Sequence, residues 1–492
     1  MSMGFSGQIK KNLTLVALML ALLPCGVQAQ HNATMYFMRD LPAVNMLNPA
    51  FQPEAGSIYV GIPLLSSVSF DGGITLKGMN IGNLLSSSPR LTPAAKNPAP
   101  YEGGYANVDI NLLNVGVLVR DMYFTLDITG KVNTEAAISG DFIKAAWYGN
   151  APYIGQAIPL NELGGYASSY IEVALGFSKE VLRDKITIGG KVKRLLGVGF
   201  ADAHLGANAF FQTNSDWSAT VRVSPEFNIA GVFDAMPDDL CSYKFGGKGW
   251  GADLGFEIKN ELFTVSGSIV NLGAIRWDNV NHRKLERGDY VVTFRGISFN
   301  DIQLGEKSNI LDVIDSLEAE KFVGNTESIL RWTTPTLTVG VAYPINEHLV
   351  AGALAGMAIG RYNTYPLFAL SLNTWKYPIN GSVSYSYGHS HNLGLGLLFG
   401  RRDMQLHIIC DNLFAANYQA AQKISFRFGL NLLLGGPKQA EKKKVWSPIN
   451  AIDHPVNSYK KTRGAEVLNI LSPKTQSPAN KQPINPLGNS GK

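Results

Sequence analysis

The sequence predicts an all-β fold, a transmembrane antiparallel β-barrel of 14 strands, or 16. Composition is the first reason: charged residues make up 16% of the 492 residues, against about 25% in soluble domains. The second is that apolar side chains alternate with polar or small ones over many segments of about ten residues, the period of a strand. Third, beyond the first 29 residues no apolar run reaches the ~18 residues that a spanning helix needs.

The first 29 residues predict export. Lys10 and Lys11 precede an apolar run at 13–23, and Val27-Gln28-Ala29 has the small residues of a cleavage site. We therefore expect residues 1–29 to be a signal peptide cut after Ala29, and a barrel that is exported belongs in a bacterial outer membrane. Pro24 disfavours the alternative in which Cys25 accepts a lipid. The other cysteines, Cys241 and Cys410, are too few for a disulfide framework; two free thiols are preferred, and a single bridge stays open.

The expected barrel covers residues 57–435. Its last strand shows the alternation best, with apolar Phe426, Phe428 and Leu430 separated by Arg427 and Gly429. Many expected strands have ten to fourteen residues, longer than the usual ~5–6, which favours a barrel over stacked β-sandwiches. Aromatic residues near strand ends, as in an interfacial girdle, are Tyr343, Tyr362, Tyr365, Trp375 and Tyr377.

Seventeen strands are expected, although bacterial barrels have even numbers, so at least one is wrong. The least regular are 57–70, which Pro63 interrupts, and the pair that meets at 197–199. The expected strands are 57–70, 107–119, 121–133, 170–179, 185–196, 199–213, 216–230, 249–259, 262–279, 287–300, 331–343, 347–360, 363–376, 379–388, 391–400, 403–412 and 423–435.

Turns and loops predict the orientation of the barrel. Short turns at 344–346 and 401–402 are expected on the periplasmic side. Segments 134–168 and 301–330 are expected as long external loops, with a helical turn at 142–148 and a helix at 309–321. Short turns inside and long loops outside are typical of such barrels, and the loops are where recognition residues usually lie.

Residues 30–56 form a Pro- and Asn-rich segment before the first strand, and they contain Asn48, Pro49 and Ala50. This Asn-Pro-Ala element resembles one in the N-terminal hatch of FadL-type outer-membrane barrels. Related Bacteroidetes barrels, including the PorV and PorP/SprF accessory proteins of type IX secretion, have a similar start. The resemblance implies a hatch inside the barrel and an apolar small molecule in the lumen. The alternative is a turn that only tethers the N-terminus.

A second resemblance lies at the end of the expected barrel. Residues 411–414, Asp-Asn-Leu-Phe, and 426–431, Phe-Arg-Phe-Gly-Leu-Asn, are similar to the last strand pair of uncharacterised Bacteroidetes barrels. Together, the two resemblances cover the layout from about residue 31 to 435. They imply an outer-membrane barrel with outer-membrane lipid around it.

Residues 436–492 are expected to be a disordered periplasmic tail. This segment has seven prolines, ten Lys or Arg and three acidic residues, a composition that does not form a core. It could bind an anionic periplasmic or outer-membrane protein, or be a solvated extension. Its basic cluster consists of Lys442, Lys443, Lys444, Lys460, Lys461 and Arg463.

Catalytic motifs are scarce. His389, Ser390 and His391 could suggest a metal site or a lipolytic serine, but no acidic partner lies nearby in sequence. The acidic residues Asp234, Asp238 and Asp239 lack the spacing of a calcium loop. No phosphate-binding loop is present, so we expect no enzyme, cofactor or metal.

The function expected first is that of a non-enzymatic accessory or scaffold barrel in secretion or surface assembly. A FadL-like passive transporter of a hydrophobic or small solute is the alternative, and an outer-membrane lipolytic enzyme is the third. A net charge of +5 gives no basic surplus of the kind that nucleic-acid binding requires.

Overall fold

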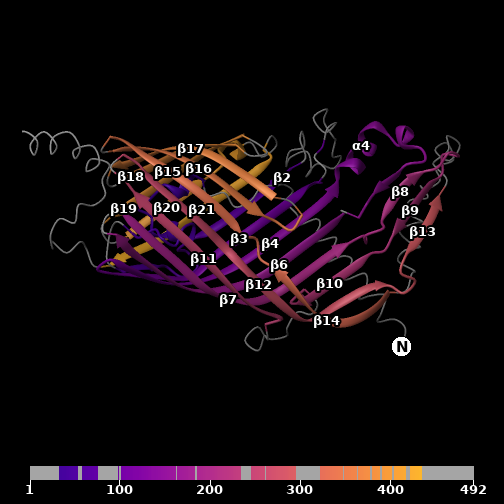
Figure 1. The fold of residues 1–492 in the computed structure, drawn as a ribbon, viewed down its shortest axis with the longest axis horizontal. Helices are drawn as coiled ribbons and strands as arrows, with labels where there is room; N and C mark the ends of the chain where they lie inside the picture. Colours follow the sequence, from indigo (N-terminus) through magenta and orange to yellow (C-terminus); the bar gives the residue numbers. More distant parts are fainter. Residues whose placement is uncertain are drawn as a thin grey trace, which may run out of the picture.

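The computed structural model shows a closed antiparallel β-barrel of 14 strands (Figure 1), as the sequence predicts. It describes residues 33–53, 58–75, 98, 101–161, 163–182, 185–233, 245–260, 262–294, 322–346, 348–362, 364–376, 379–387, 391–401, 404–416 and 421–434. The expected signal peptide, the expected helix at 309–321 and the basic tail lie outside these residues.

Three strand positions of the barrel are filled by two consecutive segments each. β1 and β2 both pair with β21 and β3, and so close the barrel. β10 and β11 both lie between β7 and β12, and β14 and β15 both pair with β12. The segments are β1 Ile58–Gly61, β2 Val68–Ile74, β3 Tyr101–Val119, β4 Met122–Ser139, β6 Gly164–Leu182, β7 Ile186–His204, β10 Glu226–Gly231, β11 Gly247–Lys259, β12 Thr264–Leu285, β14 Phe322–Trp332, β15 Thr336–Asn346, β16 Leu349–Ile359, β17 Thr364–Lys376, β18 Ile379–Tyr387, β19 His391–Arg401, β20 Met404–Cys410 and β21 Lys423–Leu434.

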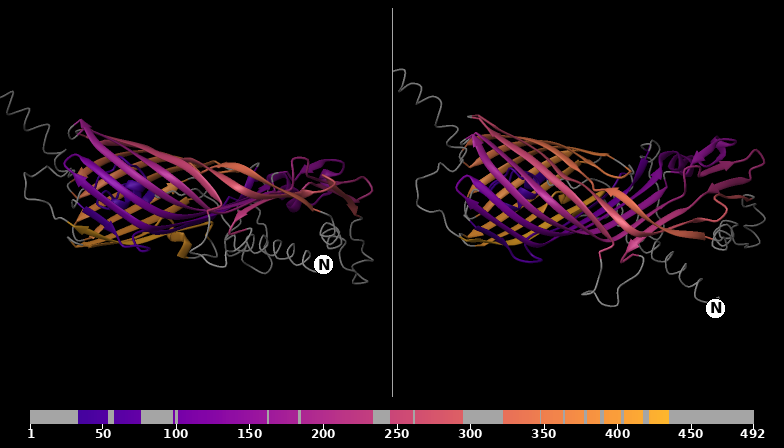
Figure 2. Two further views of the ribbon diagram at one scale, coloured as in Figure 1. Left: turned by 90° about the horizontal axis from the view of Figure 1, so that it is seen from below. Right: turned by 60° about the horizontal axis from the view of Figure 1, so that its bottom comes forward.

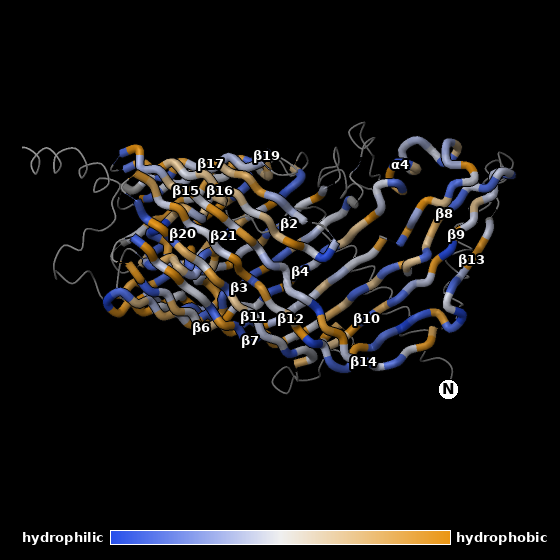
Figure 3. Tube along the Cα trace, in the orientation of Figure 1, coloured by the Kyte–Doolittle hydropathy of each residue, from blue (hydrophilic) through white to orange (hydrophobic). Residues whose placement is uncertain are grey.

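The alternation in the sequence becomes the two faces of the barrel wall. Successive side chains of a strand point to opposite faces: on β4, Phe124 is 45% exposed, whereas its neighbours Thr125 and Asp127 are buried in the lumen. Leu175 on β6 and Leu254 on β11 are likewise exposed outward. Hydrophobic side chains on the outside and polar ones inside are what a membrane-spanning barrel requires, and Figure 3 shows the alternation along the strands. In the described residues, no helix has the length and apolarity to cross a membrane.

The strands differ in length around the barrel. β3, β4, β6, β7 and β12 have 18 to 22 residues, whereas β18 and β20 have 9 and 7. The long strands continue past the closed barrel as a curved half-sheet (Figure 2). A separate four-stranded sheet of order β13-β9-β8-β5 and helix α4 (Gly140–Tyr148) lie at its far end (Figure 1). The sheet consists of β5 Ala157–Pro159, β8 Phe210–Thr213, β9 Ala219–Val223 and β13 Tyr290–Phe294.

Several expected strands differ from those observed. No turn occurs at 197–199, because β7 runs unbroken from Ile186 to His204. A Cβ on Gly197 would lie 2.6 Å from the Trp277 ring, so this glycine permits close packing within a strand. The expected strand 287–300 is wrong as a barrel strand, because β13 pairs with β9 in the small sheet. The expected strand 216–230 is wrong in its first part, which contains β9, whereas residues 226–230 belong to β10 of the barrel. The expected strand 57–70 is split into β1 and β2, and β14 occupies part of the expected loop 301–330.

Residues 33–53 form a plug inside the barrel. It contains α2 (Ala33–Tyr36) and the 3-10 helix η1 (Pro42–Met46). Its apolar side chains pack on residues of β15, β16, β17, β19 and β20 in one core cluster. A polar contact fixes its start, where the Thr34 amide donates to Asp411 Oδ1 at 2.9 Å. Members of the cluster include Tyr36, Phe37, Leu41, Val350, Leu354 and Leu398.

Candidate functional site

The Asn-Pro-Ala element lies on the side of the plug that faces the barrel wall, and it packs against two glycines of that wall. Asn48 Nδ2 donates to the carbonyls of Phe256 and Gly267, each at 3.2 Å, and Asn48 Oδ1 accepts from the Ala50 amide at 3.0 Å. A Cβ on Gly255 would lie 2.0 Å from Asn48 Oδ1. A Cβ on Gly189, the β7 partner of Gly255, would lie 2.2 Å from the Pro49 carbonyl oxygen. The absence of these side chains lets the motif reach the strands.

A buried ion pair holds the middle of the plug. Arg39 Nη2 lies 2.8 Å from Glu257 Oε1 on β11, with side chains 9% and 5% exposed. The Arg39 guanidinium also lies 3.6 Å from the centre of the Phe51 ring. A charge buried this deeply needs its partner, because an unpaired one is costly. The pair therefore ties the plug to the wall.

A layer of compensated charges crosses the lumen beside the plug. Lys193 Nζ lies 2.7 Å from Asp253 Oδ2 and 3.0 Å from Glu172 Oε1, and Lys131 reaches the same Glu172 at 3.4 Å. Lys191 pairs with Asp127 at 2.6 Å. The cavity in this layer is only about 60 Å³. The lumen is therefore nearly filled between the plug and the end of the barrel where the long strands project.

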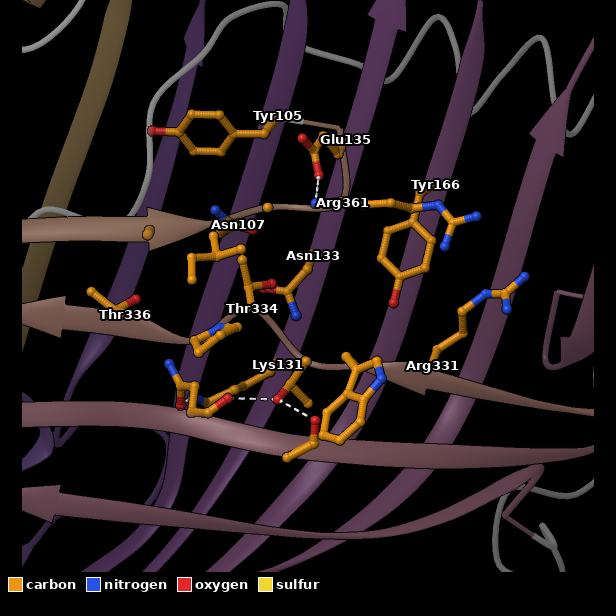
Figure 4. A pocket seen from close by; sticks show the side chains of 18 of the residues that line it. Tyr105, Asn107, Lys131, Asn133, Glu135, Tyr166, Arg331, Thr334, Thr336 and Arg361 are labelled. Atoms are coloured by element: carbon orange, nitrogen blue, oxygen red, sulfur yellow. Dashed lines mark hydrogen bonds between the residues drawn. The ribbon is translucent and has the colours of Figure 1, made fainter. Parts of the chain in front are cut away.

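A larger cavity of about 490 Å³ lies beyond the charged layer. Strands β3, β4 and β6 supply its inner wall with Tyr105, Lys131, Glu135 and Tyr166 (Figure 4). Its opposite side is the segment from Leu330 to Thr336 and the end of β16. Aromatic rings, amides and hydroxyl groups predominate among the lining side chains. This mixture is typical of a small-molecule site.

The barrel wall is interrupted at this cavity. Thr333, Thr334 and Pro335 separate β14 from β15; Thr333 Oγ1 donates to the Gly273 carbonyl at 3.0 Å, and Pro335 has no N–H for the ladder. β15 pairs with β16, but β16 ends at Ile359, so within the described residues β14 pairs with β12 alone. We call this gap between β14 and the end of β16 the window.

The cavity reaches both faces of the wall through the window. Arg331 faces inward, because it pairs across the sheet with Ile275, which is 3% exposed in the interior. Trp332 and Leu330 therefore point outward, and they are 71% and 56% exposed. All of these side chains except Ile275 line the cavity. The cavity is thus lined both by side chains that point into the lumen and by side chains that point out of the barrel.

One carboxylate joins the two edges of the window. Asp202 Oδ2 on β7 accepts from Arg331 Nη2 of β14 at 3.0 Å and from Arg361 Nη2, just after β16, at 2.7 Å. Its side chain is fully buried. Burial alone would lower the pKa of Arg361, but the Asp202 carboxylate outweighs it and raises that pKa. Arg361 thus stays charged.

The short segment after β16 is fixed by Glu135 of β4. Glu135 accepts from the backbone amides of Arg361 at 2.8 Å and Tyr362 at 3.1 Å, and from the Tyr365 hydroxyl at 2.6 Å. Burial raises the pKa of Tyr362 to about 12, so its phenol remains neutral. The lip of the cavity is therefore pre-formed by hydrogen bonds.

Comparison with known proteins places this barrel in a family. The family model described as "Family of unknown function (DUF5723)" matches residues 49–411, most of the barrel. The chain belongs to DUF5723. The match begins inside the Asn-Pro-Ala element and ends after β20. No curated protein matches the sequence.

Solved structures similar to the DUF5723 barrel include a transporter, a FadL homologue and a hydrocarbon channel. The toluene transporter TbuX of Ralstonia pickettii has 11% identity and a TM-score of 0.38, over 80% of this chain and 92% of that one. A FadL homologue of Pseudomonas aeruginosa has 11% identity and a TM-score of 0.35, over 80% and 93%. The monoaromatic hydrocarbon channel TodX, as a deletion mutant, has 11% identity and a TM-score of 0.39, over 84% and 97%.

Of the other residues singled out in the sequence, Tyr365 lines the cavity and His391 does not. His391 begins β19 of the DUF5723 barrel, exposed, with its ring 4.8 Å from that of Tyr387. His389, Ser390 and the acidic residues 234, 238 and 239 lie outside the described residues, as does the basic cluster 442–463. Cys410 is a free thiol, and Cys241 is not described. The residues that can hold a metal form no group of three in the described part of the chain.

Sequence reasoning missed the residues of the window. Asp202, Arg331, Arg361 and Glu135 come from positions up to 226 residues apart, and nothing in their spacing unites them. A partial signal was present, because Asp202 and Arg331 are isolated charges within expected strands, whereas Glu135 and Arg361 lie outside them.

Proposed function

We propose that this chain is a passive transporter of a small, predominantly apolar solute in the bacterial outer membrane. The cavity that reaches both faces of the wall at the window carries the proposal. Since the plug and the charged layer fill the lumen below, a solute in the cavity has its widest opening through the window. The outward Leu330 and Trp332 give that opening an apolar rim.

The direction of passage follows from the shape of the barrel. The short connections, such as 120–121 between β3 and β4, lie at the plugged end, which we assign to the periplasm. The window then faces the outer part of the membrane. A solute bound in the cavity would enter from outside and leave through the window or, after the plug moves, through the lumen. Secretion scaffolding stays a prediction, because the basic tail that motivates it is not described.

Blocking the window tests the proposal. In a background with Cys241 and Cys410 replaced by serine, Thr334→Cys places a thiol at the cavity lining, and a bulky maleimide would fill it. We expect uptake of radiolabelled toluene, by cells with this barrel in the outer membrane, to fall severalfold after labelling. Thr326→Cys, on an exposed part of β14 away from the cavity, is the matched control.

The two labelled variants must differ for the proposal to hold. Equal uptake before and after labelling of Thr334→Cys, with labelling verified by mass, would show that the solute does not pass the window. A loss of uptake in both variants would show that the reagent perturbs the barrel as a whole and would remove support for a specific path.

A further inference from the structure

Resting on the proposed function, we infer that the solute of this cavity is electrically neutral and bears a hydroxyl or amide group on an apolar body. The class is that of small neutral alcohols and amides, as opposed to carboxylates. Two features of the cavity carry the inference: the pairing of its charged side chains, and two adjacent amides that have no hydrogen-bond partner among the described residues.

Every cation that lines the cavity is already paired. Arg331 and Arg361 share the Asp202 carboxylate, and Lys131 pairs with Glu172 and donates to Asn271 Oδ1 at 3.0 Å. Glu172 is in turn shared with Lys193, which also contacts Asp253. When Glu135 at the lip is included, the number of positive and negative charges in and behind the cavity lining is equal. The four cations are Lys131, Lys193, Arg331 and Arg361, and the four carboxylates are Glu135, Glu172, Asp202 and Asp253. Within the described residues, the charges of the site are therefore balanced.

Burial makes this balance difficult to change. Asp202, Lys193 and Asp253 are 1%, 3% and 2% exposed. An anionic solute that drew Arg331 or Arg361 away would deprive the buried Asp202 carboxylate of one of its two cations, which is unfavourable. It would also meet the like charges of Asp202 and Glu135. A neutral solute requires neither change.

The amides supply a reason for a hydrogen-bonding group on the solute. Asn107 on β3 and Asn133 on β4 lie directly opposite each other in the sheet, and both side chains line the cavity (Figure 4). Neither amide has a hydrogen bond to any described residue. Each amide can donate and accept, so the pair can bind a hydroxyl or a second amide, whichever way it is oriented.

The aromatic side chains of the cavity determine which apolar group the solute can carry. Tyr105, Tyr166, Tyr170 and Tyr365 surround the cavity on its inner side, and Trp332 lies at the window. Aromatic side chains favour contact with a flat or compact apolar group. A volume of about 490 Å³ accommodates a single small ring with room for substituents.

Three probes with one ring test the inference: benzyl alcohol, toluene and benzoate. Binding to the full-length protein in detergent is measured by isothermal titration calorimetry at pH 7, where benzoate is ionised. We expect benzyl alcohol to bind about fivefold tighter than toluene, the value of one net hydrogen bond. Benzoate should bind at least about tenfold more weakly than the alcohol. Benzoate binding as tightly as the alcohol, or no binding of any probe, would overturn the inference.

Two substitutions assign these preferences to residues. Asn133→Leu should remove most of the advantage of benzyl alcohol over toluene, whereas Asn325→Leu, on an exposed part of β14 outside the cavity, should keep it. Asp202→Asn leaves Arg331 and Arg361 without their carboxylate and should strengthen benzoate binding about tenfold. An unchanged alcohol preference in Asn133→Leu would contradict the inference even if Asp202→Asn fails to fold.

Failure of the inference differs from failure of the proposed function. If labelling at Thr334 blocks uptake but benzoate is the preferred ligand, the transporter stands and the neutral class is wrong. If the alcohol preference holds and depends on Asn133, but labelling leaves uptake unchanged, the site binds such solutes without passing them through the window.

Discussion

At the scale of single residues, the plug depends on the space left by glycine. Gly189 and Gly255 lie side by side on β7 and β11 and receive the Asn-Pro-Ala element, where Asn48 and Ala50 are fully buried. The contact combines two side-chain hydrogen bonds to the wall with close backbone packing. Motif and receptor therefore fit only if both strands keep a bare Cα at this point.

We expect Gly255→Ala to loosen the plug. The added Cβ would meet Asn48 Oδ1 at 2.0 Å, so Asn48 must move and lose its bonds, a cost of about 1–3 kcal/mol. Hydrogen exchange of residues 33–53 should become faster. Gly130→Ala is the matched control, because its nearest contact would be the Ile110 carbonyl oxygen at 3.9 Å. Equal exchange in the two variants would show that the glycine does not hold the motif.

The sequence indicated the position of this motif but not what binds it. Asn48-Pro49-Ala50 stands out in the sequence because it lies between the expected signal peptide and the first expected strand. Its receptor is formed by glycines that are 66 residues apart in sequence, among 51 in the chain. Only the strand register shows which glycines face the plug. The same holds for Asp202, whose two arginines lie 129 and 159 residues away.

At the scale of elements, the alternation of apolar and polar residues predicted where strands occur, but it did not predict which sheet each strand joins. The strands from β15 to β21 lie close to their expected positions, because the shorter half of the barrel has tight connections and regular apolar faces. The segments 216–230 and 287–300 also alternate, yet β9 and β13 pair with each other in the small sheet. A period of two identifies a half-buried strand, but it does not identify the partner strand.

The small sheet should be sensitive to acid through Asp289. The Ser224 hydroxyl and the Arg222 guanidinium donate to this carboxylate, and they lower its pKa. The folded sheet therefore favours the charged form: the stabilisation is complete above the unfolded pKa of about 3.9 and is lost as the pH falls through the lower folded value.

Hydrogen exchange of residues 219–223 and 290–294, which form β9 and β13, measures this effect. Corrected for intrinsic rates, protection should decline in the wild type as the pH falls below about 4. In Asp289→Asn, protection should be lower already at neutral pH and should vary less with pH. Identical pH profiles for the two proteins would contradict the proposed role of Asp289.

At the scale of the whole molecule, the lumen has three successive zones along the barrel axis: the plug, the charged layer and the cavity. The plug closes the end with short connections, the charged layer leaves only about 60 Å³, and the cavity of about 490 Å³ opens at the window. Along the described strands, antiparallel pairing closes the barrel from β1 and β2 round to β21. The gap between β14 and the end of β16 thus lies where the lumen has room.

This arrangement predicts that the plug, and not the charged layer, prevents ion flow. Deleting residues 33–53 removes the apolar cluster and leaves a lumen lined by polar and charged side chains, which water can fill. In planar bilayers we expect a stable, large conductance from the deletion variant and little from the wild type. The conductance of Glu257→Gln should lie between those of the two proteins. This substitution leaves Arg39 buried without its partner at a cost of about 3–5 kcal/mol, and it therefore raises the population of molecules with a displaced plug. A folded deletion variant that conducts no better than the wild type would show that the ion pairs of the charged layer close the lumen by themselves.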